Sequence, residues 1–300
     1  MQYITQAEKL FLLRTDETAY LLLINEYGHP EHLHYGTPVA LADAAALRYK
    51  RTMPYGAEVL YAEDDPTYCL DNLPLEWSGI GKGDFRVSPI ELELPDGSYT
   101  CDFVFQCAKL QPGARGAATL PGAYAEESAD AETLVLTLKE KVFALQLELI
   151  YTVYPHENVI TRRSVLHSQE ASPVRIRRMM SQLLDLPNDG YRLVTLDGDW
   201  IQEAHRHDRA LMPGCFVNES TTGNSSNRHN PGVMLAAPTA CEDSGNVYGF
   251  NLIYSGNHYT AVELSPRNMV RIVSGINPLC FCWQLVQGET FETREAVLTF

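Results

Sequence analysis

Hydrophobic and polar residues alternate along most of this chain. In KLFLLRTDETAYLLLINEYG (9–28), two apolar runs flank Asp16 and Glu17, and in IELELPDGSYTCDFVF (90–105) two such runs flank the turn residues 95–98. A period of two with turn residues between the runs is typical of β-hairpins. Both stretches are therefore predicted to form hairpins.

The same pattern continues to the end of the sequence. Residues 133–168 predict three strands with breaks near 139–141 and 155–158, and further period-two segments follow from Val174 onward. The one helical candidate is ALADAAALRYK (40–50), and the irregular stretch 51–66 after it is predicted to be a long loop. So many short strands predict an all-β fold, a large two-layer antiparallel β-supersandwich with little helix. No linker or repeat marks a boundary, which predicts a single domain over 1–300.

Composition and charge exclude several classes of partner. With 38 acidic and 23 basic residues the formal net charge is −15, which repels nucleic acids and anionic membrane surfaces. No apolar run reaches the roughly 18 residues of a membrane span, and no secretory signal is visible at the amino terminus, so we expect a cytoplasmic protein. The seven cysteines lack a C-x-x-C spacing, which predicts neither a disulfide framework nor a zinc site.

Two histidines, His205 and His207, share one face of a predicted strand. Such a pair suits a metal ion, but a plain polar strand has the same pattern, and no third ligand is suggested nearby. We therefore predict no metal and no cofactor.

The glycine-rich stretch GIGKGDFR (79–86) raises the question of a phosphate site. Lys82 lies between Gly81 and Gly83, and a strand pattern follows where a phosphate loop requires a helix. A structural turn is the better interpretation. Asp84 and Arg86, two apart, are expected to share a strand face, each with a partner elsewhere; a contact to sugar or to a neighbouring subunit is the alternative.

Other conspicuous side chains allow two interpretations each. Trp77 and Trp200 could stack on a sugar ring or pack in the core, and packing is favoured for Trp77 because it follows Pro74 and Leu75. The polar loop 221–232, with Asn227 and Asn230, is either a solvated excursion or a site for sugar hydroxyls.

Four stretches in the same order resemble the amino-terminal domain of bacterial α-galactosidases of glycoside hydrolase family 36. They are YCLDNLPLEWSGIGKGDFR (68–86), ENVITRRSVL (157–166), VYGFNLIYSGN (247–257) and RIVSGINPLCFCWQLVQGETFET (271–293). The resemblance implies a β-supersandwich that precedes a (β/α)8 barrel and a smaller carboxy-terminal β domain. It also implies an enzyme that releases terminal galactose from α-galactosides such as melibiose and raffinose by a retaining mechanism.

The resemblance further implies that this chain holds no catalytic residue. In the family, both catalytic carboxylates are aspartates of the barrel, and the nucleophile lies in a Lys-x-Asp stretch after a barrel strand. The alternation of strands and helices that a barrel requires is absent from these 300 residues. The chain is therefore predicted to be a non-catalytic domain of the enzyme, inactive alone.

The resembling enzymes also suggest where this domain meets a substrate pocket. There the region that corresponds to 37–66 approaches a pocket across a subunit interface. We therefore expect Tyr35, Arg51, Asp64 and Asp65 to be at least partly exposed and close to such an interface in a homo-oligomer. The α-galactoside would then be a partner of the complete enzyme.

Two alternatives come from other functional classes. One is a free-standing carbohydrate-binding β-sandwich. The other is an aldose epimerase, since supersandwich folds also serve mutarotases with a histidine acid and a glutamate base. His258 and Glu263 would take these roles, but they lie on opposite faces of one predicted strand. The non-catalytic galactosidase domain is favoured over both.

Overall fold

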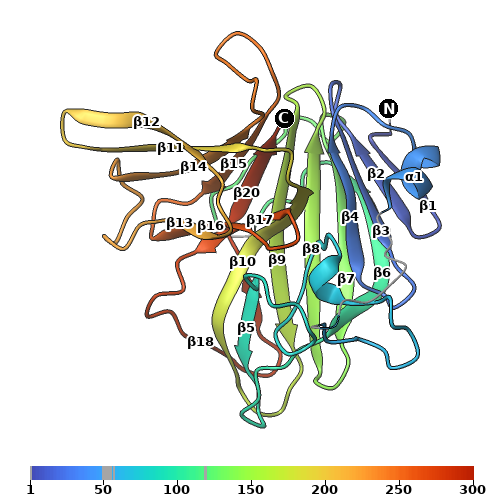
Figure 1. Ribbon diagram of the computed structural model, residues 1–300. Helices are drawn as coiled ribbons and strands as arrows, with labels where there is room; N and C mark the ends of the chain where they lie inside the picture. Colours follow the sequence, from blue (N-terminus) through green and yellow to red (C-terminus); the bar gives the residue numbers. More distant parts are fainter. Residues whose placement is uncertain (1, 49–55, 57, 118–119) are drawn as a thin grey trace.

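A computed structural model of the chain describes residues 2–48, 56, 58–117 and 120–300. These residues form three antiparallel β-sheets with little helix, which confirms the predicted all-β class (Figure 1). The helical segments are η1 (Leu41–Asp43), α1 (Ala44–Leu47) and η2 (Leu70–Asn72). Of the helix predicted over 40–50, the described residues form η1 and α1, which together cover 41–47. None of the described helices is long and apolar enough to cross a membrane.

The first sheet is a four-stranded meander. Its strands follow sequence order: β1 (Ile4–Ala7), β2 (Leu10–Arg14), β3 (Ala19–Ile24) and β4 (Pro30–Gly36). The predicted hairpin around Asp16 is confirmed, because β2 and β3 pair antiparallel with Leu10 opposite Leu23. Phe11 faces the main core while Leu12 packs beneath α1. Burial on both faces explains why these strands are more apolar than strict alternation requires.

The other two sheets contain the long strands of the second half. The six-stranded sheet consists of β13 (Gly214–Glu219), β16 (His258–Leu264), β17 (Met269–Ile276), β10 (Val174–Pro187), β18 (Trp283–Leu285) and β5 (Ile90–Glu93). The ten-stranded sheet consists of β12 (Gln202–Ala210), β11 (Arg192–Asp199), β14 (His229–Ala236), β15 (Val247–Ile253), β20 (Glu295–Thr299), β9 (Val159–Ser168), β8 (Leu145–Tyr154), β7 (Glu132–Glu140), β6 (Phe103–Pro112) and β19 (Thr290–Glu292). The three strands predicted over 133–168 are β7, β8 and β9. The second break lies at 155–158 as expected, whereas the first lies at 141–144, slightly later than the expected 139–141.

The hairpin predicted over 90–105 is wrong, although its turn forms. The Gly97 N–H donates to the Leu94 carbonyl at 2.9 Å, as in a tight turn. The flanking strands then separate, because β5 pairs with β10 and β6 pairs with β7. The turn therefore connects two different sheets.

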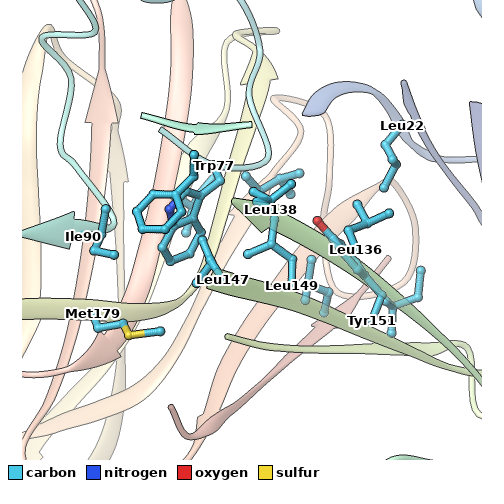
Figure 2. Packing of buried hydrophobic residues seen from close by; sticks show 14 of the residues in the cluster. Leu22, Trp77, Ile90, Leu136, Leu138, Leu147, Leu149, Tyr151 and Met179 are labelled. Carbon is cyan, nitrogen blue, oxygen red and sulfur yellow. The ribbon is translucent and has the colours of Figure 1, made fainter. Parts of the chain in front are cut away.

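One hydrophobic core joins the three sheets. The main cluster of buried side chains draws on the four-, six- and ten-stranded sheets alike. Figure 2 shows this contact, with Leu22 of β3, Ile90 of β5 and Leu147 of β8 in the same cluster. The ten-stranded sheet thus packs against both smaller sheets, as expected for a layered sandwich.

Candidate functional site

The glycine-rich stretch forms a tight loop that buries the side chains of Asp84 and Arg86. Gly81 and Gly83 have φ angles of +89° and +91°, in the left-handed region that favours glycine. A Cβ atom on Gly81 would lie 2.3 Å from the Thr100 hydroxyl oxygen, so glycine is also required sterically. The next regular element is β5, so the loop provides no helix N-terminus for a phosphate.

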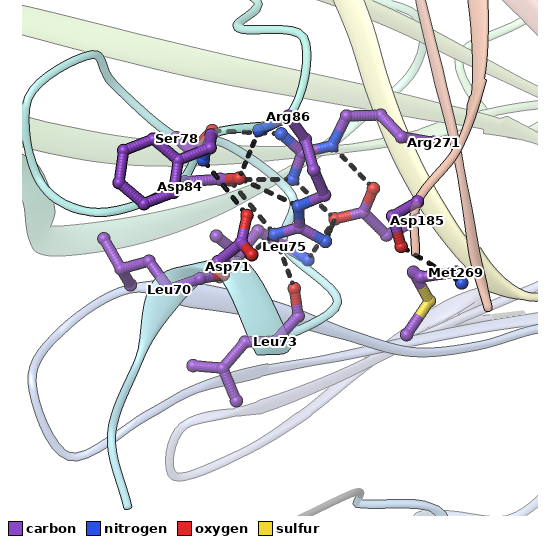
Figure 3. A network of polar contacts seen from close by, with 12 residues as sticks. Leu70, Asp71, Leu73, Leu75, Ser78, Asp84, Arg86, Asp185, Met269 and Arg271 are labelled. Atoms are coloured by element: carbon purple, nitrogen blue, oxygen red, sulfur yellow. Dashed lines mark hydrogen bonds and ion pairs between the residues drawn. The ribbon is translucent and has the colours of Figure 1, made fainter. Parts of the chain in front are cut away.

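Asp84 and Arg86 belong to a buried ionic cluster with Asp185 of β10 and Arg271 of β17 (Figure 3). We call these four residues the Arg271 cluster. Arg86 Nε donates to Asp84 at 2.8 Å and Arg86 Nη1 to Asp185 at 3.1 Å. Arg271 Nη2 contacts Asp84 at 2.9 Å and Asp185 at 2.7 Å. All four side chains are at most 3% exposed.

The cluster corrects one expectation and supports another. Asp84 and Arg86 pair with each other, because they lie in a turn and not on the single strand face assumed from their spacing. Arg86 Nη2 also donates to the carbonyls of Leu70 and Leu73 at 2.8 and 2.9 Å, which fixes the η2 turn. This arrangement supports the structural interpretation of the GDFR stretch.

Electrostatics keeps the Asp84 carboxylate ionised. Burial alone would raise the pKa of Asp84, but the guanidinium groups of Arg271 and Arg86 outweigh it and lower the pKa to about 2. Arg271 responds in the opposite sense, since contact with Asp185 and Asp84 outweighs its burial and raises its pKa. Two carboxylates and two guanidinium groups thus balance each other inside the protein.

The buried acids of the Arg271 cluster do not meet the requirements of glycoside cleavage. Retaining hydrolysis requires an accessible nucleophile and a protonated acid about 5–5.5 Å apart. Asp84 stands two residues after Lys82, the Lys-x-Asp spacing expected of the family's nucleophile, but its side chain is 1% exposed and bound by two arginines. Burial raises the pKa of nearby Glu263, whose carboxylate accepts the Val87 N–H at 2.7 Å. A sugar therefore cannot reach the Asp84 carboxylate, and Asp84 and Glu263 cannot serve as nucleophile and acid.

Two of the predicted pocket residues lie in the core. Trp77 is 2% exposed and packs beside Ile90 and Leu147, which agrees with the packing interpretation (Figure 2). Tyr35 is also 2% exposed, so its expected surface position is wrong. Its ring lies 5.3 Å from that of Tyr20, because β4 turns this side chain toward the interior.

The predicted loop 51–66 is described only in part. Asp64 is exposed and Asp65 is half-buried, as expected of both. The Asp65 carboxylate accepts hydrogen bonds from Thr67 Oγ1 at 2.6 Å and from the Tyr27 hydroxyl at 3.1 Å, so it braces its own loop. Arg51 lies outside the described residues.

Trp200, Asn227 and Asn230 are surface residues and do not belong to the Arg271 cluster. Trp200 is 79% exposed at the tip of the β11–β12 hairpin, which projects from the body of the molecule (Figure 1). Asn227 lies between β13 and β14, and Asn230 is the second residue of β14. Both line a hollow of about 310 Å³ together with Ser225 and Ser226. The structure thus brings the two asparagines together and leaves Trp200 separate from the residues described as lining that hollow.

The histidines considered for metal binding and epimerase chemistry are also placed. His205 and His207 lie on β12, and the described ranges contain no group of three or more His, Cys, Asp or Glu side chains suited to a metal ion. His258 on β16 is 0% exposed, and burial lowers its pKa to about 4, so the ring is neutral at neutral pH. A sugar cannot reach this ring, and the structure does not support the epimerase hypothesis.

A second polar cluster, in the middle of the core, was not anticipated. The Glu76 carboxylate is fully buried and accepts hydrogen bonds from the hydroxyls of Tyr20 and Tyr151 at 2.7 Å. Arg162 Nη2 lies 3.1 Å from it and His32 Nδ1 2.9 Å. Burial would raise the pKa of Glu76, but Arg162 lowers it to about 2.

The sequence did carry a signal for the residues that were missed. Glu76, Asp185 and Arg271 are single charged residues within otherwise apolar or small-residue stretches, as in SQLLDLP and MVRIVSGI. A charge in a strand that is buried on both faces needs a partner of opposite sign. Such isolated charges indicate which segments meet in space.

These features define an antiparallel β-sandwich whose most conspicuous ionic residues hold its own fold together. The chain belongs to the glycosyl hydrolase family 36 N-terminal domain family, whose model matches residues 28–286.

Similar proteins include α-galactosidases from bacteria. The chain is 32% identical over 295 residues to the α-galactosidase AgaA of Geobacillus stearothermophilus, covering 97% of this chain and 40% of AgaA. The crystal structure of AgaB from the same organism superimposes with a TM-score of 0.95 at 31% identity, covering 99% of this chain and 41% of AgaB. A variant of AgaA solved in complex with raffinose has a TM-score of 0.94 at 32% identity, with 97% and 40% covered. The chain thus spans about 40% of the length of curated relatives such as AgaA.

Proposed function

We propose that this chain is the N-terminal, non-catalytic part of an α-galactosidase that hydrolyses terminal α-galactosides such as melibiose and raffinose with retention of configuration. The observation that carries the proposal is the family match over 28–286 in a chain whose buried acids Asp84 and Asp185 are both bound by Arg271. Relatives of this chain are named α-galactosidases, and structures of AgaA variants contain raffinose or stachyose.

We further propose that the domain organises a homo-oligomer and shapes the mouth of the substrate pocket. Two surface features support this role. The projecting β11–β12 hairpin exposes Trp200 and Ile201, at 79% and 71%, and Asp64 is exposed on a loop that is long for a compact sandwich. Large exposed apolar side chains at the end of a projecting element are suited to contact another subunit or domain.

The catalytic part of the proposal is tested by reconstitution. The purified 300-residue chain is incubated with a chromogenic α-galactoside, and the assay is repeated after addition of a separately expressed barrel fragment from the complete enzyme. No turnover is expected from the chain alone, because binding without a positioned acid and nucleophile gives no rate acceleration. Turnover that appears only with the barrel supports the proposal. Turnover by the chain alone that persists through further purification would overturn it.

A further inference from the structure

A cavity of about 550 Å³ lies where the first sheet meets the turns of the other two sheets. Its described walls include β4, residues 71–74, the end of β10 with the connection to β11 (residues 185–191), Tyr248 of β15 and residues 267–269. Figure 3 shows one side of this region, with Asp71, Asp185 and Met269. The volume falls within the range of small-molecule sites, about 300–1,000 Å³.

Aromatic rings form one wall of the cavity. The rings of Tyr191 and Tyr248 are perpendicular, at 85°, with centroids 5.8 Å apart. The Tyr248 hydroxyl donates to the Tyr35 carbonyl at 2.8 Å, which holds that ring in place. Tyr191 is half-buried, so part of its surface remains available. An aromatic surface of this kind suits the apolar face of a pyranose ring.

Polar groups at the rim have defined roles. His34 Nε2 lies 2.8 Å from the Thr37 carbonyl, which only accepts, so Nε2 carries the proton and Nδ1 is the acceptor. Burial lowers the pKa of His34, which keeps the ring neutral at neutral pH. Asp189 is exposed and adds a carboxylate that accepts hydrogen bonds. The rim thus offers acceptors to hydroxyl donors.

The inner wall contains residues of β4 that also carry polar groups. A bulge at Leu33 in β4, where Leu22 is opposite His32 and Leu21 is opposite His34, turns His32 and Tyr35 toward the same ring, that of Tyr20. His32 Nε2 and the Tyr35 hydroxyl have no hydrogen-bond partner among the described residues. Both atoms are buried behind this wall, so the accessible polar groups of the cavity are those at its rim.

The charge of the lining selects among ligand classes. Among the described lining residues, Asp71 lies 3.2 Å from Arg267 Nε, and Asp185 is balanced by Arg86 and Arg271, so the exposed Asp189 is a carboxylate that a ligand can meet. An exposed carboxylate disfavours phosphates, carboxylates and other anions. A neutral molecule with hydroxyl groups and one apolar face fits both the charge and the aromatic wall.

We propose that this cavity binds one pyranose ring of a neutral saccharide, with the sugar face against Tyr191 and hydroxyl groups on Asp189 and His34. This site is not required for hydrolysis, so the proposal goes beyond the function proposed above. A single sugar ring in a site of this size binds weakly, with a dissociation constant on the order of millimolar.

The test measures binding directly, by saturation-transfer NMR and calorimetry on the intact protein. The probes are methyl α-D-galactopyranoside, methyl α-D-glucopyranoside and inorganic phosphate. At least one pyranoside is expected to bind with one-to-one stoichiometry, and phosphate is not. Tyr191→Ala and Asp189→Ala should each weaken binding about tenfold, whereas Tyr191→Phe should stay within about threefold of the original because the ring is kept. Tyr124→Ala, at an 80% exposed position outside the described lining, is the matched control.

Three results would overturn the proposal. They are no pyranoside binding up to about 50 mM, pyranoside binding that neither alanine variant weakens, and a crystal structure of the intact protein in which another segment of the protein fills the cavity. Circular dichroism establishes that each variant is folded. Because the readout is binding, its failure leaves the galactosidase assignment intact, and a lack of hydrolysis by the complete enzyme leaves this site intact.

Discussion

The Arg271 cluster and the β11–β12 hairpin are both rich in charged residues, but they differ completely in their surroundings. In the cluster every charged side chain is at most 3% exposed and contacts a group of opposite sign. On β12 all nine residues are exposed, and Arg206 contacts Asp208 at 3.0 Å with the side chains 43% and 34% exposed.

The difference shows that the same residue types carry different energies in the two regions. An exposed ion pair is screened by water and contributes about 0–1 kcal/mol. Removal of one partner from a buried pair leaves a charge without compensation and costs about 3–5 kcal/mol. The cluster therefore acts on stability, and the hairpin is free to act on contacts with other molecules.

The largest effect is expected when the cluster loses its central acid. Asp185 contacts Arg86 and Arg271 and also accepts the Leu75 N–H at 2.9 Å. Asp185→Ala should reduce the free energy of unfolding by about 3–5 kcal/mol. Asp84→Ala should cost less, about 1–3 kcal/mol, because both arginines keep Asp185. Urea unfolding followed by fluorescence measures both losses.

The exposed Asp208 provides the control for this prediction. Asp208→Ala removes ion pairs of the same chemistry with Arg206 and Arg192 and should change stability by no more than about 0.5 kcal/mol. If Asp185→Ala and Asp208→Ala had equal effects, burial would not be what separates the two regions.

Acid should weaken the cluster through Asp84. Its folded-state pKa of about 2 lies below the ordinary value of 3.8, so its stabilisation is complete above about pH 4 and is lost as the pH falls toward 2. Relative to the original chain, Asp84→Asn should flatten the fall in unfolding free energy across this window by about 2 kcal/mol. Urea titrations at several pH values measure the two profiles, and parallel profiles would show that Asp84 is not the group that titrates.

The smallest effect on stability is expected at the tip of the hairpin. Trp200→Ala removes a side chain that is 79% exposed and should change the free energy of unfolding by about 0.5 kcal/mol or less. If the hairpin contacts another subunit, the same change should shift the intact protein toward smaller species in light scattering. An unchanged mass distribution would exclude Trp200 from the proposed subunit contact.

The strands of this fold were predictable from sequence where pairing is local. β2 with β3, and β7 with β8 and β9, are neighbours both in sequence and in space, so alternation and turn residues define them. The separation of β5 from β6 was not predictable, because the partner of β5 is a strand about 80 residues later. There Glu93 accepts hydrogen bonds from Arg175 and Arg177, a contact that no local pattern contains.

The candidate residues show the same limit. Tyr35 lies beside a predicted loop, so the sequence predicts that it is exposed. It is buried instead, against Tyr20 and Tyr248, which come from other strands. The pairing of Asp84 with Arg86 is local, yet its burial is created by Asp185 and Arg271, about 100 and 185 positions away. Spacing identified the residues, and only the tertiary fold decided their role.

The position of β20 has a consequence for how the chain folds. Residues 295–299 form an inner strand of the ten-stranded sheet, between β15 and β9. During synthesis, β15 and β9 each keep an unpaired edge until β20, about 130 positions after β9, has left the ribosome. Pairings between distant segments close slowly, and open edges promote aggregation in the meantime. We therefore expect the middle of the sheet to close only once β20 has been synthesised, and a nascent chain that still lacks β20 to depend on chaperones.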